Sequence, residues 1–220
     1  MMQINADRSQ LAIVHGAQLP WVQSPEQGVE RRMLERVGDE VALATSIVRY
    51  EPNTRFSAHT HALGEEFLVL EGTFADDQGA YPAGTYVRNP PGSRHAPFSD
   101  SGCVILVKLR QMGNDETEQI RSFGHQRHWS DAITSGIEKA QLYTNSRLSV
   151  QLLRMKAGSE VPKRDHERGE EIFVVEGSVL WCDESTTTLD KWSWLRNPGN
   201  KHCAILAQDD SVLWIKRGHL

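Results

Sequence analysis

Short apolar runs separated by turn residues recur along the whole chain. Several have the length of a β-strand and are bounded by Gly, Pro, Asn or Asp; examples are FLVLEGTF (67–74), GCVILVKL (102–109), IFVVEGSVLW (172–181) and SVLWIKR (211–217). YPAGTY (81–86) and NPPGS (89–93) carry the residues typical of tight turns. The most helix-like stretch, VERRMLERV (29–37), also fits a strand, and we interpret it as one. The pattern predicts an all-β fold, either a sandwich or a small barrel.

Two parts of the sequence repeat each other. Residues 47–72 (IVRYEPNTRFSAHTHALGEEFLVLEG) match residues 152–177 (LLRMKAGSEVPKRDHERGEEIFVVEG) at a constant shift of 105 positions. Further along, RNPPGSRH (88–95) matches RNPGNKH (196–202) at nearly the same shift. Two blocks in the same order predict two homologous halves.

The repeat suggests how the chain divides into domains. We expect a first domain over residues 1–110, of which residues 1–20 form an N-terminal arm. Residues 111–140 are polar and aperiodic, and we interpret them as a linker. Residues 141–220 then form the second domain.

Four side chains of the first half have the spacing of a metal site. His59 and His61 are two positions apart, so on a strand both imidazoles point to one face. Glu65 shares that parity, with Phe67 continuing the same inward face. His95 follows on another strand, after a Pro-Gly turn. Three imidazoles and one carboxylate suit Zn, Mn, Fe(II), Ni or Co better than Ca or Mg.

The second half carries an altered version of this set. Arg164 stands where His59 stands in the first half, while His166, Glu170 and His202 keep the other three positions. A guanidinium does not lose its proton, so it opposes a bound cation. Either Arg164 swings out and a site of two histidines and one glutamate survives, or Arg164 pairs with Glu170 and replaces the metal. We favour the second arrangement and expect one metal ion per chain.

The two motif regions resemble a known superfamily. HTHALGEEFLVLEG (59–72) followed by GTYVRNPPGSRH (84–95) is similar to the paired signature motifs of the cupins, although Ser99 stands where cupins usually have Asn. The amino-acid sequence between residues 64 and 109 resembles that of the ChrR-type cupins, which form the C-terminal domain of ChrR anti-sigma factors. The resemblance covers about residues 20–110 and, more loosely, 140–220.

This resemblance implies a fold and a cofactor. The fold would be two tandem double-stranded β-helix barrels, an all-β bicupin. The ligands would be His59, His61, Glu65 and His95, usually holding zinc in the anti-sigma members, with iron, manganese or nickel as alternatives. The anti-sigma members bind the sigma factor through a helical domain with a His-x3-Cys-x2-Cys motif. That motif does not occur here, so a sigma factor is not an expected partner.

Composition and charge narrow the possible partners and the cellular location of the protein. The net charge of −5 disfavours direct binding of nucleic acid. No apolar stretch reaches the roughly 18 residues of a membrane span, and no secretory signal is visible. The cysteines, Cys103, Cys182 and Cys203, lack metal-site spacing and predict free thiols in a reducing compartment. We therefore expect a soluble cytoplasmic protein.

Two functions remain open at this stage. The first is a metal-binding regulatory or stress-sensing protein without a sigma-binding domain of its own. The second is an enzyme, a metal-dependent (iron) dioxygenase acting on a small dicarbonyl or hydroxyketone compound, as in relatives with the same barrel. Either function would place a small molecule at the metal, and the chain could form a homodimer. A purely structural or storage protein is motivated only by the fold.

Overall fold

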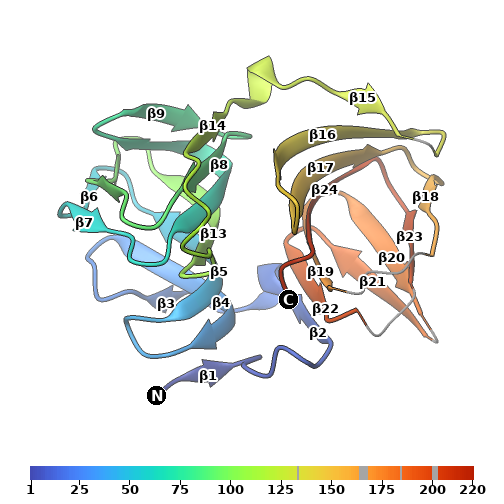
Figure 1. The fold of residues 1–220 in the computed structure, drawn as a ribbon, viewed down its shortest axis with the longest axis horizontal. Coiled ribbons are helices and arrows are strands. Elements are labelled where there is room, and N and C mark those ends of the chain that lie inside the picture. Colours follow the sequence, from blue (N-terminus) through green and yellow to red (C-terminus); the bar gives the residue numbers. More distant parts are fainter. Residues whose placement is uncertain (133, 164–167, 184, 200–202) are drawn as a thin grey trace. The chain divides into compact units, whose positions relative to one another are not determined.

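The chain folds almost entirely into strands. A computed structural model describes residues 1–220 except 133, 164–167, 184 and 200–202. The described residues form no α-helix, only the 3₁₀ turns η1 (Gly16–Gln18) and η2 (Gly124–Gln126). The ambiguous stretch 29–37 is strand β4 (Val29–Val37), so the all-β prediction is confirmed (Figure 1). Among the described residues, no helix has the length and apolar character needed to span a membrane.

The strands group into two compact units. The first unit comprises Met1–Ala6 and Leu19–Arg127, and the second comprises Asp7–Gln18 and His128–Leu220. Part of the segment expected as an N-terminal arm therefore belongs to the second unit. The segment expected as a linker, residues 111–140, contains strands that contribute to the sheets of both units.

The first unit contains the strands of the first half except β2 (Ala12–His15), together with one strand beyond that half. Its main sheet follows the order β1 (Gln3–Ile4), β4, β5 (Leu43–Tyr50), β13 (Cys103–Leu109), β8 (Glu65–Asp76), β10 (Tyr86–Asn89) and β14 (Ile120–Ser122). Shorter strands pair beside it: β3 (Val22–Gln23), β6 (Thr54–Arg55), β9 (Gly79–Pro82) and β12 (Phe98–Ser99). A separate pair consists of β7 (His59–Thr60) and β11 (Arg94–His95).

Strand β8 shows how the pattern of apolar residues determines what faces the core. Phe67 and Val69 alternate with Glu66 and Leu68, and the first pair lies in the core of the first unit. The register against β13 shifts between Val104 and Ile105, so β8 carries a bulge after Val69. The core that results is rich in aromatic residues: Val29, Val48, Tyr50, Phe67, Val69, Phe74, Tyr81, Val87, Cys103, Ile105 and Val107.

The second unit repeats this order of strands. One sheet follows the order β15 (Ser130–Asp131), β16 (Ile137–Thr144), β17 (Ser149–Met155), β24 (Ser211–Arg217), β19 (Glu170–Glu176), β22 (Ser193–Asn197) and β2 (Ala12–His15). A second sheet contains β18 (Glu160–Val161), β23 (Ala204–Ala207), β20 (Ser178–Cys182) and β21 (Thr186–Asp190). The series β5, β13, β8, β10 and β17, β24, β19, β22 correspond, which confirms two homologous halves.

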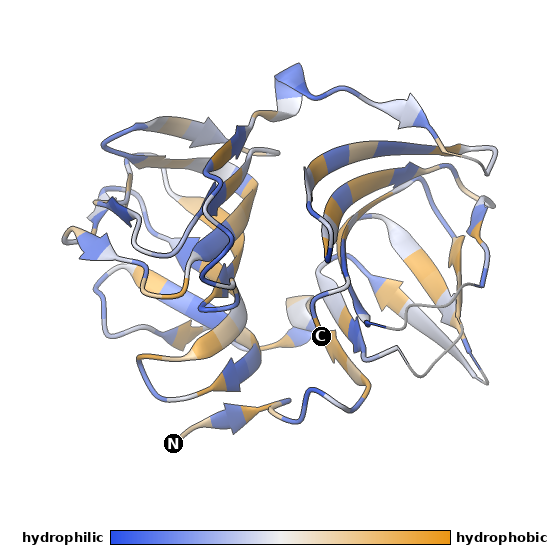
Figure 2. Ribbon diagram, viewed as in Figure 1, coloured by the Kyte–Doolittle hydropathy of each residue, from blue (hydrophilic) through white to orange (hydrophobic). Residues whose placement is uncertain are grey.

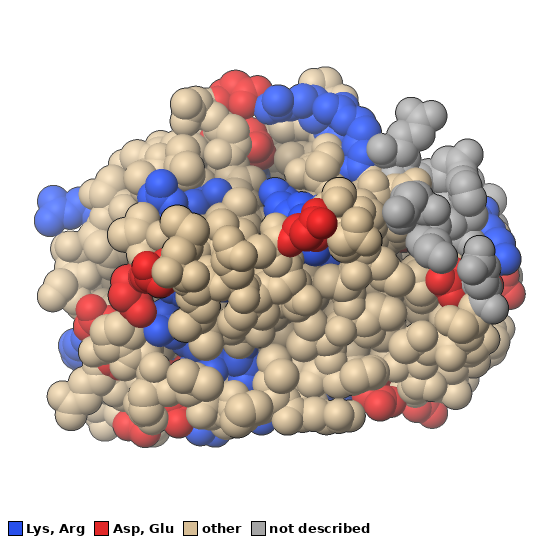
Figure 3. Space-filling model, turned by 90° about the horizontal axis from the view of Figure 1, so that it is seen from below, with Lys and Arg blue, Asp and Glu red and all other residues tan. Residues whose placement is uncertain are grey.

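The distribution of apolar and charged residues agrees with strands that have one face in a core. Strands such as β16 and β17 show alternating polar and apolar bands in Figure 2, as expected of strands with one face in a core. On the face drawn in Figure 3, basic and acidic side chains of the described residues lie interspersed. That mixture agrees with the small net charge of −5.

Candidate metal centre

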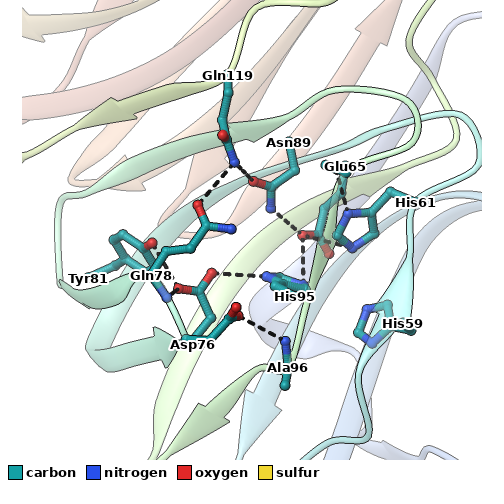
Figure 4. Close-up of polar contacts among 12 residues, drawn as sticks. His59, His61, Glu65, Asp76, Gln78, Tyr81, Asn89, His95, Ala96 and Gln119 are labelled. Atoms are coloured by element: carbon teal, nitrogen blue, oxygen red, sulfur yellow. Dashed lines mark hydrogen bonds and ion pairs between the residues drawn. The ribbon is translucent and has the colours of Figure 1, made fainter.

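Three imidazoles meet at one end of the first unit. His59 lies on β7, His61 follows it directly, and His95 lies opposite His59 in the register of β11 against β7. Their ring centroids are 4.7–5.1 Å apart, and their ligand nitrogen atoms all lie within 4.8 Å of one another. The structure thus brings together the three histidines that the sequence singled out (Figure 4).

Glu65 completes the cluster from the start of β8. Its Oε2 atom lies 3.4 Å from His61 Nε2 and 3.6 Å from His95 Nε2. Two ligand atoms that each lie about 2.1 Å from one ion are roughly 3.0–3.4 Å apart in octahedral or tetrahedral geometry. The two distances from Glu65 Oε2 are close to this range. Asn89 Nδ2 donates a hydrogen bond of 3.0 Å to the same Oε2 and orients the carboxylate.

The second nitrogen of each ring has its own hydrogen-bond partner. The three bonds join His59 Nδ1 to the Ser57 carbonyl (3.1 Å), His61 Nδ1 to Ser93 Oγ (3.0 Å) and His95 Nδ1 to Asp76 Oδ2 (3.0 Å). A carbonyl or carboxylate accepts a hydrogen bond from Nδ1–H, so the proton stays on Nδ1 and the lone pair is on Nε2. At least two of the rings are therefore held in the tautomer that coordinates through Nε2.

The arrangement fits a cation at the centre. The Nε2 atoms of His61 and His95 are buried and have no hydrogen-bond partner in the described part of the chain. A buried polar atom without a partner costs free energy, which a metal ligand bond would recover. His59 is exposed, so the centre is open to solvent on its side.

Burial and charge shift the protonation of these groups. The pKa of His61 lies below its ordinary value because burial disfavours the imidazolium, although Glu65 acts in the opposite sense. For Asp76, burial acts to raise the pKa, but hydrogen bonds from His95, the Gln78 backbone and Tyr81 bring it below the ordinary value. The lowered pKa of His61 favours its neutral imidazole, the form that binds a metal, and the lowered pKa of Asp76 keeps that carboxylate ionised.

Aromatic side chains form the inner wall of the centre. The Phe56 ring lies 6.3 Å from His59, and the Phe74 ring lies 6.1 Å from His95. Tyr50 contacts both at 5.4 and 5.5 Å. Burial and the nearby Glu65 carboxylate raise the pKa of Tyr50 well above its ordinary value, so it stays neutral. A ligand at the centre would meet an apolar wall on one side and water on the other.

The sequence did not reveal the residues that orient the ligands. Asp76, Ser93 and Asn89 each lie far along the chain from the ligand that they contact, and no spacing rule links them. One signal for Asp76 is present, since a carboxylate interrupts the apolar alternation that follows Phe74 on β8. The buried thiols Cys103 and Cys203 pack in the cores, as expected of structural cysteines.

Most of the altered set in the second half lies outside the described residues, namely Arg164, His166 and His202. Glu170 is described, and it faces Asn197 across β19 and β22 as Glu65 faces Asn89. Arg217 Nε donates a hydrogen bond of 3.1 Å to Glu170 Oε2. The pairing of Arg164 with Glu170 stays a prediction.

Comparison with known proteins places this fold. No curated protein matched the sequence. Solved structures with similar folds include a dioxygenase candidate from Nostoc punctiforme (TM-score 0.77, 15% identity, 96% of this chain and 84% of that one). Two others are YlbA from E. coli (TM-score 0.74, 13% identity, 97% and 93%) and salicylate 1,2-dioxygenase from Pseudaminobacter salicylatoxidans (TM-score 0.67, 12% identity, 96% and 85%). At these identities the likeness concerns the fold alone.

A family model resolves the relationship further. The ChrR cupin-like domain matches twice, over residues 9–113 and 117–220, and so covers nearly the whole chain. The two matches correspond to the two repeats found in the sequence, and the all-β fold is that of a bicupin. With both repeats matched, this chain belongs to the ChrR cupin-like family.

Proposed function

We propose that the first unit binds one divalent transition metal ion through His59, His61, His95 and Glu65. The observation that carries this proposal is the pair of buried, unpartnered Nε2 atoms of His61 and His95 beside the Glu65 carboxylate. Three imidazoles and a carboxylate form a donor set of intermediate hardness, for which zinc is the first choice and iron, manganese and nickel are alternatives.

The centre is also suited to a small ligand with oxygen donors. Four protein ligands leave coordination positions open in a five- or six-coordinate ion, and the exposed side of His59 gives access to them. A metal bound there would act as a Lewis acid toward a carbonyl or carboxylate oxygen. The aromatic wall of Phe56, Tyr50 and Phe74 would exclude water from the inner side of such a ligand.

We assign this centre a regulatory or sensing role, in which occupancy by metal or ligand is the signal. Membership of the ChrR cupin-like family supports this role. Dioxygenase activity is the second candidate, favoured by the open side of the centre together with folds shared with dioxygenases. The two roles differ in the metal that they require, since oxygen activation needs a redox-active ion whereas sensing can use a redox-inert ion such as zinc.

Elemental analysis of protein purified without a histidine tag tests the binding proposal. We expect one equivalent of metal per chain, and we expect its loss in His61→Ala and Glu65→Gln. His125→Ala is the matched control, because His125 is exposed on η2 and takes no part in the centre. A wild-type chain that takes up no metal on reconstitution would refute the proposal.

Oxygen consumption separates the two roles. Stoichiometric zinc without oxygen uptake in the presence of dicarbonyl compounds would exclude the dioxygenase. Stoichiometric iron with substrate-dependent oxygen consumption would exclude the sensor. The His61→Ala variant serves as the blank, since it lacks one of the ligands.

A further inference from the structure

A chain of hydrogen bonds leads outward from one histidine of the candidate metal centre. His95 Nδ1 is bonded to Asp76 Oδ2 at 3.0 Å. The other carboxylate oxygen, Asp76 Oδ1, accepts a bond of 2.9 Å from the Tyr81 hydroxyl. That hydroxyl in turn accepts a bond of 3.0 Å from Arg121 Nε. Arg121 thus restrains the Tyr81 hydroxyl, which restrains the Asp76 carboxylate. Asp76 in turn restrains the imidazole of His95.

The chain is buried where it meets the imidazole. Asp76 and Tyr81 are 4% and 2% exposed, and His95 is 3% exposed. The backbone N–H of Gln78 donates a further bond of 2.8 Å to Asp76 Oδ1 (Figure 4). Arg121 reaches the Gln78 side chain at 2.8 Å, so its guanidinium is held at two points. A side chain that is already restrained in this way loses no further conformational entropy when it orients its neighbour.

The outermost member of the chain comes from the second repeat. Arg121 lies on β14, within residues 117–220 matched by the second copy of the family model. In the structure, β14 is nevertheless part of the first unit, where Arg121 pairs with Val87 of β10. The first repeat by itself therefore lacks one residue of this chain.

The second unit supplies an internal comparison. In matching registers, Trp181 occupies the position of Asp76, and Leu189 occupies that of Tyr81. Ile13, which pairs with Leu195, occupies the position of Arg121, which pairs with Val87. These three residues are apolar and pack in or against the core of the second unit.

This comparison separates a structural role from a role at the metal. A purely apolar set fills the same three positions in a barrel of the same strand order, so the fold does not require the polar chain. The polar chain occurs in the unit with the complete ligand set, and the apolar one occurs where Arg164 replaces the first histidine. The fold therefore does not account for these polar side chains, and their contact with His95 points to a role at the candidate centre.

We propose that Arg121, Tyr81 and Asp76 are positioning residues that hold His95 with Nε2 directed at the metal. The inference rests on the proposed metal binding and adds to it that the centre of the first unit is completed by the second repeat. Residues that orient a metal-ligating histidine typically contribute 10–100-fold to metal affinity.

The test measures metal affinity and geometry in the full-length protein. Chelator competition with Zn²⁺ gives the affinity, and the visible absorption spectrum of the Co²⁺-loaded protein reports the coordination geometry. We expect affinity to fall at least about 10-fold in Asp76→Asn and Tyr81→Phe, each with an altered Co²⁺ spectrum. Arg121→Ile, which introduces the residue of the second unit, should lower affinity as well, and Arg121→Lys should recover part of the loss.

A double variant tests whether the residues act in series. If Arg121 acts through the Tyr81 hydroxyl, Tyr81→Phe/Arg121→Ile binds Zn²⁺ no more weakly than Tyr81→Phe. Independent, additive losses would overturn the serial arrangement. Arg127→Ile is the control. Arg127 donates hydrogen bonds to the carbonyls of Gly84 and Ser122 and is not one of the residues that link Arg121 to His95.

The outcomes distinguish this inference from the proposed function. If the wild type binds no metal, the proposed function fails. If the wild type binds Zn²⁺ and the three single variants bind it equally well with unchanged Co²⁺ spectra, the positioning role is refuted while metal binding stands. If Arg127→Ile weakens binding as much as Arg121→Ile, docking of β14 is responsible and the inference also fails.

Discussion

The protonation of His61 links the candidate centre to pH. A proton and a metal ion compete for the same Nε2 atom, so metal affinity falls as the ring becomes protonated. A single ligand imidazole with the ordinary pKa near 6.5 would lower the apparent metal affinity about 30-fold at pH 5. Because burial lowers the pKa of His61, the loss that its protonation causes appears at lower pH.

We therefore predict that metal affinity declines below about pH 6.5 and that protonation of His61 contributes less than about 30-fold to the loss at pH 5. Chelator competition at half-unit steps from pH 7.5 to 5 measures the curve. Metal retained with unchanged affinity at pH 5 would show that fewer histidines bind it.

The same shift affects the stability of the metal-free protein. The folded state disfavours protonated His61, so the unfolded chain binds the proton first. The contribution to stability is complete above about pH 6.5 and is lost as the pH falls toward the lowered pKa of the folded state. Urea unfolding of metal-free wild type and His61→Gln at pH 7.5 and 5.5 checks the sign. The difference in stability should favour the wild type less at pH 5.5.

Cys103 should be chemically inert in the folded protein. Burial raises the pKa of this thiol to about 11, with a hydrogen bond to Ser99 acting in the opposite sense. Only the thiolate reacts, and at pH 8 its population is about 10⁻³. Cys182 is partly exposed, and we predict that a disulfide reagent labels it first. Rapid labelling that persists in Cys182→Ser would contradict this assignment.

At the scale of elements, strand β8 depends on a residue without a side chain just after its bulge. Gly72 has a φ of +69°, and a β-carbon there would collide with the Gly102 carbonyl and lie 3.0 Å from Cys103 Cα. Gly177, its counterpart in the second repeat, also has a positive φ, of +78°. Both the backbone conformation and the close approach of strand β13 therefore require glycine.

We predict that Gly72→Ala destabilises the first unit by about 3 kcal/mol, of which roughly 1–2 kcal/mol reflects the left-handed backbone. Gly92→Ala is the control, since Gly92 has a φ of +84° but nothing within 4 Å of its β-carbon position. Urea unfolding of the metal-free proteins compares the two. Equal losses would show that the contact with Gly102 contributes nothing.

For the whole molecule, stability of the second unit should depend on the N-terminus. Ile13 lies in the first family match, yet β2 pairs with β22 and Ile13 packs against the core of the second unit. We predict that Ile13→Ala destabilises the second unit by about 1–2 kcal/mol, less than the 2–5 kcal/mol of a fully buried isoleucine.

Tryptophan fluorescence follows this change, because Trp129, Trp181, Trp192, Trp194 and Trp214 all belong to the second unit. Val22→Ala is a suitable control, since Val22 is exposed on β3 of the first unit. A second unit that unfolds at the same urea concentration in Ile13→Ala would contradict the assignment of β2.

Metal stoichiometry tests the difference between the two halves. We predict one tightly bound ion per chain, unaffected by His166→Ala. Two equivalents in the wild type, or loss of the only equivalent in His166→Ala, would place the active centre in the second half and overturn the interpretation of Arg164.

Local regularities in the sequence predict much of the fold and of the candidate metal site. The alternation of strands predicts which side chains share a face, so the grouping of His59 and His61 with Glu65 follows from spacings of two and four. The repeat predicts two similar halves and directs attention to Arg164. These features depend on neighbours along the chain, or on a comparison of the chain with itself.

Other features were decided only by tertiary structure. Pairing of β14 with the first unit and β2 with the second is determined by which exposed strand edge each segment meets, and no local pattern encodes that choice. The orientation of His95 depends on Asp76, Tyr81 and Arg121, whose side chains meet because strands distant in sequence pack side by side. The residue types able to bind a metal are therefore readable from the sequence, while the contacts that would hold them in place arise from the folded chain.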